Sequence, residues 1–285
     1  MSKRLSSLIA TAGALAVTGA LVLAGGAGAA GTAGDSLPTL NIALTGTTGI
    51  SLSGSEVSGA VNVVSTFSGK APSGPNSNGP TWGLVRLNPG VTIQQAAGAV
   101  QSHHGDINAL GPYGSLFADG SAGIPVQTVL TPGSYAALNI TGNGTPGFVT
   151  FTVTQSSAPA ALPRAAATQT AIEFAFRGPK VLHNGTIVRA VNDGYLVHMI
   201  IGFGVKNPAT GRKVIALLRA GKTRKAERLA GHNFFNLAGP VSPGGMQQQV
   251  LHAKPGYYVE ACFMDTQDGR EHTALGMERL IRIVK

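Results

Sequence analysis

Alternation of apolar and polar positions indicates β-strands along most of this chain. The segments "FVTFTV" (148–153) and "RLIRIV" (279–284) alternate with a period of two, which places every second side chain on one face of a sheet. Val, Thr and Ile are frequent between Gly, Pro and Asn residues, a composition typical of strands joined by turns. Two segments, 92–103 and 212–231, are instead compatible with helices. The pattern predicts an all-β protein with two helical insertions.

The same pattern is present twice. "TPGSYAALNI" (131–140) matches "KPGYYVEACF" (254–263), with a Pro-Gly turn and a following tyrosine in register. Upstream, "WGLVRLNPG" (82–90) matches "HMIIGFGVKNP" (198–208) with a small gap. Each copy runs from strands through a helical segment to a hairpin and a final strand. The chain is therefore predicted to contain two copies of one sandwich-type domain.

A segment without apolar periodicity separates the two copies. It reads "QSSAPAALPRAAATQT" (155–170) and is rich in Ala, Ser and Pro, which is typical of a linker. A chain of 285 residues also usually holds more than one core. We therefore expect a first domain over 36–155, a linker over 156–170 and a second domain over 171–285.

The first 30 residues have the features of an export signal. Lys3 and Arg4 precede an apolar stretch (8–24), and Ala27-Gly28-Ala29 fits the pattern that a signal peptidase cleaves. This predicts a secreted or cell-envelope protein with no membrane span after signal removal. An uncleaved N-terminal anchor is the alternative, because the apolar stretch is just long enough to cross a bilayer.

Charge is distributed unevenly between the two copies. The chain carries a net charge of +9, and after residue 160 there are 17 Lys and Arg against 8 Asp and Glu. Segment 212–228 is the most basic, with Glu227 as its only acid. One interpretation is a docking face for an acidic redox partner or an anionic envelope surface; the alternative is a solvated helix face. Nucleic acid is not expected as a partner, because the chain is predicted to be exported and lacks interleaved aromatics.

The only cysteine of the chain lies in "CFMDTQDGREHTALGM" (262–277). A lone cysteine cannot form an internal disulfide, and a free thiol is easily oxidised outside the cell. Cys262 must therefore be deeply buried, pair between chains, or bind a ligand. A histidine and a methionine follow it, and both are metal ligands by residue type.

Three motifs of the second copy resemble those of cupredoxins, the blue-copper proteins. "AVNDGYLVHMIIGFGV" (190–205) is similar to the strand that carries the first histidine ligand. "KPGYYVEAC" (254–262) is similar to the approach to the cysteine ligand, and "HTALGM" (272–277) to the histidine and methionine that follow. The resemblance covers roughly 171–285. It implies a chain of two tandem cupredoxin-like Greek-key β-sandwich domains, each with a short helical insertion.

The resemblance also implies a metal site. Its ligands would be His198, Cys262 and His272, with Met277 as a weak axial ligand to one copper ion per chain. That donor set suits copper in both oxidation states, so the implied role is electron transfer or copper handling. The first copy has Asn139 at the position of Cys262 and Trp82 at that of His198 in the overlay. It keeps the scaffold without the ligands.

One departure from the family separates Cys262 from His272. Cupredoxins have a few residues between the two ligands, whereas nine, "FMDTQDGRE", lie between them here. Asp268-Gly269 is a good turn signal, and a small hairpin at this point would return His272 to the site. If the hairpin does not form, His272 is exposed on a loop and Cys262 simply packs. The chain would then be a metal-free tandem β-sandwich acting as an extracellular binding or adhesion module.

Enzyme motifs are absent from the sequence. There are no His-x-His pairs for a trinuclear copper centre, and Cys262 lacks the signature of a thiol enzyme. We therefore expect a protein that is not an enzyme. His103, His104 and Asp106 resemble a second metal cluster, but adjacent histidines on a helix point in different directions, so a solvated helix end is expected there.

Overall fold

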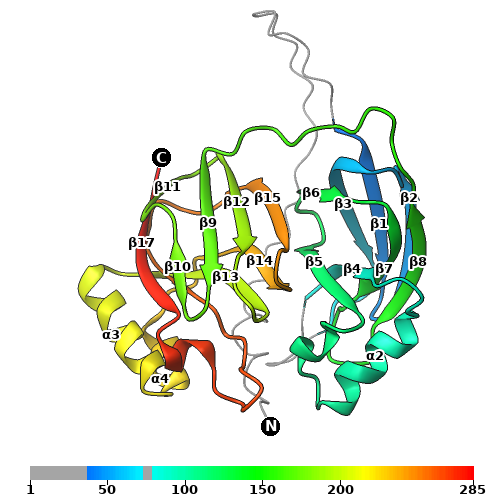
Figure 1. Cartoon of the computed structure of the whole chain (residues 1–285). Coiled ribbons are helices and arrows are strands. Elements are labelled where there is room, and N and C mark those ends of the chain that lie inside the picture. Colours follow the sequence, from blue (N-terminus) through cyan, green and yellow to red (C-terminus); the bar gives the residue numbers. More distant parts are fainter. Residues whose placement is uncertain (1–36, 73–78) are drawn as a thin grey trace, which may run out of the picture.

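The computed structural model describes residues 37–72 and 79–285 and contains two β-sandwiches side by side (Figure 1). The predicted export signal (1–30) lies outside the described residues. Within them, no helix combines the length and the apolar character needed to cross a membrane. The first sandwich extends over β1 to β8 and the second over β9 to β17.

The first sandwich has two four-stranded layers and one α-helix. Its elements are β1 (Thr39–Thr45), β2 (Gly49–Gly54), β3 (Gly59–Ser68), β4 (Thr81–Leu87), α2 (Ile93–Ser102), the 3-10 helix η2 (Ile107–Leu110), β5 (Gly114–Ser121), β6 (Val126–Leu130), β7 (Gly133–Asn139) and β8 (Gly147–Val153). Helix α2 begins at a capping box, in which Thr92 and Gln95 satisfy each other's backbone N–H groups. The layers enclose a core that includes Trp82 and Tyr135.

The second sandwich repeats the plan with one extra strand and two helices. Its elements are β9 (Ala167–Ile172), β10 (Ala175–Arg177), β11 (Val181–His183), β12 (Ile187–Asn192), β13 (His198–Val205), α3 (Pro208–Arg219), α4 (Thr223–Leu229), β14 (Phe234–Val241), β15 (Met246–Val250), β16 (Gly256–Ala261), η3 (His272–Leu275) and β17 (Glu278–Val284). Gly221, with a φ of 63°, follows α3 and divides the single helix predicted over 212–231 into two.

The strand order of one half is repeated in the other. β6-β3-β1-β2 in the first half corresponds to β15-β12-β9-β10 in the second, and both contain one parallel pair, β1 with β3 and β9 with β12. The predicted Pro-Gly-x-Tyr hairpins are also equivalent. The Tyr135 hydroxyl donates to the Thr131 carbonyl at 2.8 Å, and that of Tyr258 to the Lys254 carbonyl at 2.7 Å. The prediction of an all-β chain with two tandem sandwiches and helical insertions is confirmed.

One sheet is continuous through both halves. β6 and β15 pair antiparallel at Gln127 and Gln248, so the eight strands run β10-β9-β12-β15-β6-β3-β1-β2. A second contact joins β5 to β14, where the Asp119 carboxylate accepts the Gly239 N–H at 2.7 Å. A Cβ at Gly239 would lie 1.9 Å from that carboxylate, so glycine is required there. The two halves therefore share backbone and side-chain contacts and are not merely tethered.

Two details of the sequence interpretation need correction. β9 begins at Ala167, inside the segment predicted as linker, because residues 167–171 pair parallel with β12. The overlay of Trp82 on His198 is also wrong by two residues. Tyr135 pairs with Arg86 and Tyr258 with Gly204, so the position equivalent to Trp82 is Ile200. The sequence overlay could not detect this shift, because both strands consist largely of apolar residues and a small gap had been allowed between the two segments.

Candidate metal centre

Three of the four predicted ligands converge at one end of the second sandwich. His198 is the first residue of β13, Cys262 directly follows β16, and His272 begins η3. The two Nδ1 atoms lie 3.1 Å apart. The Cys262 Sγ lies 3.3 Å from Nδ1 of His272 and 3.8 Å from Nδ1 of His198. All three side chains have no exposed surface. Each residue therefore points one donor atom at a common centre.

The predicted hairpin between Cys262 and His272 forms. Asp265 and Glu271 make an antiparallel bridge, and the Thr266 N–H donates to the Arg270 carbonyl at 2.9 Å. Gly269 supplies the left-handed residue of the turn, with a φ of 79°. The His272 N–H then donates to the Met264 carbonyl at 2.8 Å. These bonds return the chain after nine intervening residues and bury His272 instead of exposing it on a loop.

Met277, the fourth predicted ligand, is fully buried. Its N–H donates to the His272 carbonyl at 3.0 Å, and its carbonyl accepts the Cys262 N–H at 3.1 Å. The backbone of Met277 thus joins the segments that carry two of the converging side chains. Its thioether as an axial ligand stays a prediction.

Burial sets the protonation of the three donors. It lowers the pKa of His198 to about 4, against a smaller opposing effect of the Glu173 carboxylate. Burial also lowers the pKa of His272 to about 4, and the neighbouring His198 adds to this. Both imidazoles are therefore neutral at pH 7 and each has a free lone pair. Burial raises the pKa of the Cys262 thiol to about 12, so this thiol ionises at neutral pH only if a cation stabilises the thiolate.

The donor geometry fits a bound cation better than a purely packed core. A neutral imidazole has one N–H and one lone pair, so without a cation two facing Nδ1 atoms are both satisfied only if one ring carries its proton on Nδ1. That ring then keeps a buried lone pair on Nε2, and neither Nε2 atom has a hydrogen-bond partner among the described residues. If both Nδ1 atoms bind a metal, each proton must be on Nε2. Nε2 of His198 lies 3.7 Å from a Glu173 carboxylate oxygen, which favours that tautomer. Two imidazoles and a thiolate are the in-plane donors of a blue-copper site.

Residues that the sequence interpretation missed surround the centre. Glu173 lies in the β9–β10 turn, where the N–H groups of Tyr195 and Leu196 donate to its carboxylate. Partial burial raises the pKa of Glu173, but these donors outweigh it and hold the pKa below the usual value. Phe174 packs edge-on against the His272 ring at 5.2 Å and has a φ of 53°. No local motif marks either residue, because the contacts form only when β9 and β13 come together.

The other predicted candidates do not join this cluster. Among the described residues, His198, Cys262 and His272 form the one group of three or more such side chains placed to hold a metal. His103 and His104 are exposed at the end of α2, as expected for a solvated helix end. The basic segment 212–228 forms α3 and α4, and α3 packs against η3, which begins with His272. Its Lys and Arg side chains are exposed.

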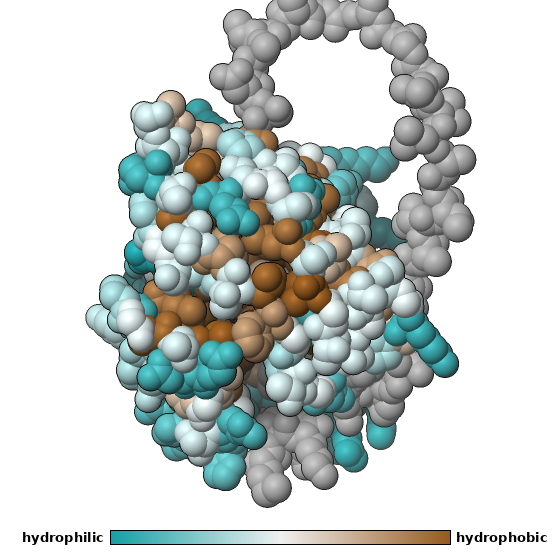
Figure 2. Space-filling model, turned by 90° about the vertical axis from the view of Figure 1, so that its right-hand side faces the viewer, coloured by the Kyte–Doolittle hydropathy of each residue, from teal (hydrophilic) through white to brown (hydrophobic). Residues whose placement is uncertain are grey.

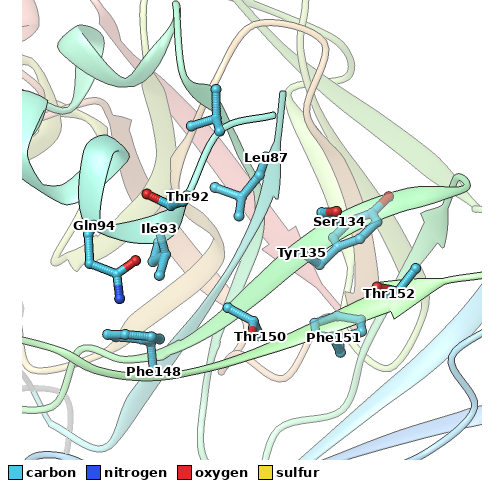
Figure 3. Close-up of a pocket in the computed structure, with 11 residues that line it drawn as sticks. Leu87, Thr92, Ile93, Gln94, Ser134, Tyr135, Phe148, Thr150, Phe151 and Thr152 are labelled. Atoms are coloured by element: carbon cyan, nitrogen blue, oxygen red, sulfur yellow. The ribbon is translucent and has the colours of Figure 1, made fainter. Parts of the chain in front are cut away.

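A pocket of about 430 Å³ lies in the first sandwich, away from the three donors (Figure 3). Leu87, Ile93, Phe148 and Phe151 line it together with small polar side chains. Its one titratable side chain, Tyr135, already donates its hydroxyl proton to the Thr131 carbonyl. Figure 2 views the side of the molecule where β2, β8 and α2 lie and shows a band of apolar surface there. Among the residues that line the pocket, none is a histidine, cysteine, aspartate or glutamate.

Comparison with known proteins finds likeness in structure only. No family model and no curated protein sequence matches the chain. Similar solved structures include a reduced auracyanin from the photosynthetic bacterium Roseiflexus castenholzii (18% identity, 41% of this chain and 95% of that one, TM-score 0.26). A multicopper oxidase is similar over 86% of this chain and 88% of its own (11% identity, TM-score 0.25). A copper nitrite reductase from Nitrosomonas europaea is similar over 87% and 93% (10% identity, TM-score 0.23).

These comparisons correct one expectation. The chain was expected not to be an enzyme because His-x-His pairs are absent, yet the structures similar to most of its length include two copper enzymes. The missing motif concerns one kind of copper centre and does not exclude others. At these identities and TM-scores the likeness defines no activity for this chain, and the expectation is withdrawn.

Proposed function

We propose that the chain is a copper-binding protein whose second sandwich holds one ion through His198, Cys262 and His272, with Met277 as a weak axial ligand. The observation that carries this proposal is the approach of three fully buried donor atoms, two Nδ1 and one Sγ, to within 4.8 Å of one another. A metal-free packing role for Cys262 would require one of the two rings to keep a buried lone pair on an Nε2 that has no hydrogen-bond partner in the described part of the chain.

When bound, copper in such a donor set supplies one-electron chemistry. The residues of this chain prepare the site for it. Burial keeps both imidazoles neutral and excludes water, and the Met199 N–H donates to the Cys262 sulfur at 3.4 Å, which stabilises negative charge on it. The hairpin and the Met277 backbone fix His272 relative to Cys262. A site fixed in this way supports electron transfer, since little has to move between oxidation states.

We also propose a partner and a location. The exposed Lys and Arg side chains of α3 and α4 flank the segment that carries His272, so we propose that this surface docks an acidic redox protein. An anionic envelope polymer is the other occupant considered for it. Secretion or an envelope location rests on residues 1–30 alone.

The proposal is tested by titrating the purified chain with Cu(II) and following visible absorption. We expect an intense band that saturates at one equivalent and is lost in Cys262→Ser and in His272→Ala. His103→Ala, which removes an exposed histidine, is the matched control and should titrate like the unmodified chain. If the unmodified chain shows no band and retains no copper after dialysis, the proposal is wrong and the metal-free binding module is favoured.

A further inference from the structure

A side chain of the first sandwich, Asn108, forms hydrogen bonds with two segments that carry the converging donors of the second. Asn108 lies in η2 (Ile107–Leu110), between α2 and β5. Asp106 caps this short helix, and its Oδ1 accepts both the Asn108 N–H at 2.9 Å and the Asn108 Nδ2–H at 2.8 Å. These two bonds fix the amide of Asn108 in one orientation, with its oxygen directed to the second sandwich.

The amide contacts both segments that carry the converging donors. Its Oδ1 accepts the Val197 N–H at 2.8 Å, and Val197 immediately precedes His198. Its Nδ2 donates to the Asp265 carbonyl at 3.3 Å, and Asp265 opens the hairpin between Cys262 and His272. One side chain thus links, across the interface, two segments that are 68 residues apart in sequence (197 and 265).

Neither segment is held by a regular strand ladder where Asn108 binds it. The pairing of β13 with β14 shifts register between His198 and Ile200 and again between Ile200 and Ile201. The hairpin has an isolated bridge, Asp265 with Glu271, and the backbone bonds at Thr266 and His272 described above, in place of a strand ladder. Val197 is buried, so without Asn108 its N–H would lose this partner away from water, an arrangement that proteins avoid. Ile107, next to Asn108, also packs against the cores of both halves.

We infer that Asn108 is a positioning residue of the metal centre, through which the ligand-free half holds the His198 segment and the hairpin at a fixed separation. The inference rests on the proposed copper site, but the fixation itself is a property of the chain with or without copper. It gives the first sandwich a role beyond that of a spacer. Substituting Asn108 should therefore change the site itself and not only the stability of the interface.

The test compares Asn108→Ala with Thr128→Ala in the full-length chain. Thr128 also makes a hydrogen bond across the interface, to the Met246 carbonyl at 2.7 Å, but touches neither ligand segment. Two readouts are used: the absorption band and affinity of the Cu(II)-loaded chain, and the rate at which the Cys262 thiol of the copper-free chain reacts with an aromatic disulfide. We expect Asn108→Ala to shift the band, weaken copper binding about 10-fold or more, and expose the thiol. Thr128→Ala should leave all three unchanged.

A second variant keeps the test decisive if Asn108→Ala fails to fold. Asp106→Ala removes the two bonds that orient the amide and keeps Asn108, so it should change band and thiol rate in the same direction by a smaller amount. The inference is overturned if the Asn108 and Asp106 variants match the Thr128 control in thiol reactivity and, where copper binds, in band and affinity. If the unmodified chain binds no copper, the proposed function fails, and the thiol rates still decide whether Asn108 fixes the segments.

Discussion

Nδ1 of His198 and Nδ1 of His272 lie 3.1 Å apart, although the two residues are separated by 74 positions in the sequence. Each ring turns this nitrogen toward the other, and Nε2 of His198 lies 3.7 Å from a carboxylate oxygen of Glu173 in the β9–β10 turn. The two Nδ1 atoms can therefore face a common cation while Nε2 of His198 faces the carboxylate. We make four predictions, the first of which concerns Glu173.

Glu173→Gln should raise the reduction potential of the copper-loaded chain. The substitution keeps an oxygen for the Tyr195 and Leu196 N–H groups. It removes the negative charge beside His198, and that charge stabilises the oxidised state of the site, which is the more positive one. Potentiometric titration measures the change. Glu56→Gln, which removes a charge in the first sandwich, is the control. Equal potentials for the Glu173 variant and the unmodified chain would mean that the carboxylate does not act on the site.

Gly269→Ala should weaken copper binding by straining the hairpin that returns His272. Gly269 has a φ of 79°, where an alanine costs about 1–2 kcal/mol. Gly123→Ala is a matched control, because Gly123 has a φ of 84° in a turn of the first sandwich and equally open space around it. Both variants should lose similar stability in urea titrations, but only Gly269→Ala should lower copper affinity. Unchanged affinity in both would show that the hairpin is not needed to hold His272.

Asp119→Asn should abolish part of the pH dependence of stability. Burial raises the pKa of Asp119 from 3.8 to about 7, while the Gly239 N–H and Gln247 oppose the rise. The carboxyl group of Asp119 therefore binds its proton more tightly in the folded chain than in the unfolded chain. Protonation of Asp119 therefore stabilises the folded state. This contribution, on the order of 4 kcal/mol, is fully present below about pH 4 and is lost as the pH rises through 7.

Urea unfolding of the copper-free chain between pH 4 and pH 8 measures the Asp119 effect. The unmodified chain should lose stability across this window relative to Asp119→Asn, which keeps an oxygen for the Gly239 N–H. Glu260, whose pKa burial raises to about 6, titrates in both proteins and cancels in the comparison. Parallel pH profiles of stability for the two proteins would show that folding does not raise the pKa of Asp119.

Reversing charge on the basic surface should change reaction rates with small redox complexes according to their sign. The triple variant Lys222→Glu, Arg224→Glu, Lys225→Glu alters exposed residues in and next to α4. If electrons enter near this surface, oxidation of the reduced copper-loaded chain by ferricyanide, an anion, should slow, and oxidation by a cationic cobalt complex should accelerate. Stopped-flow rates at low ionic strength provide the measurement.

The control for this experiment changes the same number of charges at other positions after residue 160. Arg164→Glu, Arg177→Glu, Lys180→Glu alters three other exposed bases. Equal effects of the two triple variants would show that only net charge matters, and the docking surface would then be placed wrongly. Loss of both effects at high salt is expected, because exposed charges are screened.

The sequence predicted the repeat because each copy keeps a turn whose chemistry is local. A Pro-Gly turn followed by a tyrosine fixes a hairpin within a few residues, and Tyr135 and Tyr258 make the same hydrogen bond. The converging donors were expected from the resemblance of three motifs to cupredoxins, which the order of residues in a single chain is enough to show. The exact strand register was not, because apolar residues fill both β4 and β13 and a shift of two keeps the same face inward.

No sequence pattern identifies the contacts that Asn108 and Glu173 make. Asn108 is an ordinary polar residue after a helix, and its partners Val197 and Asp265 are reached through backbone atoms, which any residue type supplies. Glu173 likewise binds backbone N–H groups of a loop more than 20 residues away. The Glu173 contacts depend on how the loops of the second sandwich pack together, and the Asn108 contacts depend on how the two sandwiches meet. That arrangement follows from the pairing of β6 with β15, which no local pattern specifies.

The pairing of β6 with β15 also has a consequence for dissecting the protein. Gln127 and Gln248 join two sheets at strands that would otherwise be bare edges, with unpaired N–H and C=O groups open to other chains. A fragment containing either sandwich alone would expose that edge and would invite self-association through it. Each sandwich therefore shields an edge strand of the other, and we expect the intact pair to be more soluble than either half alone.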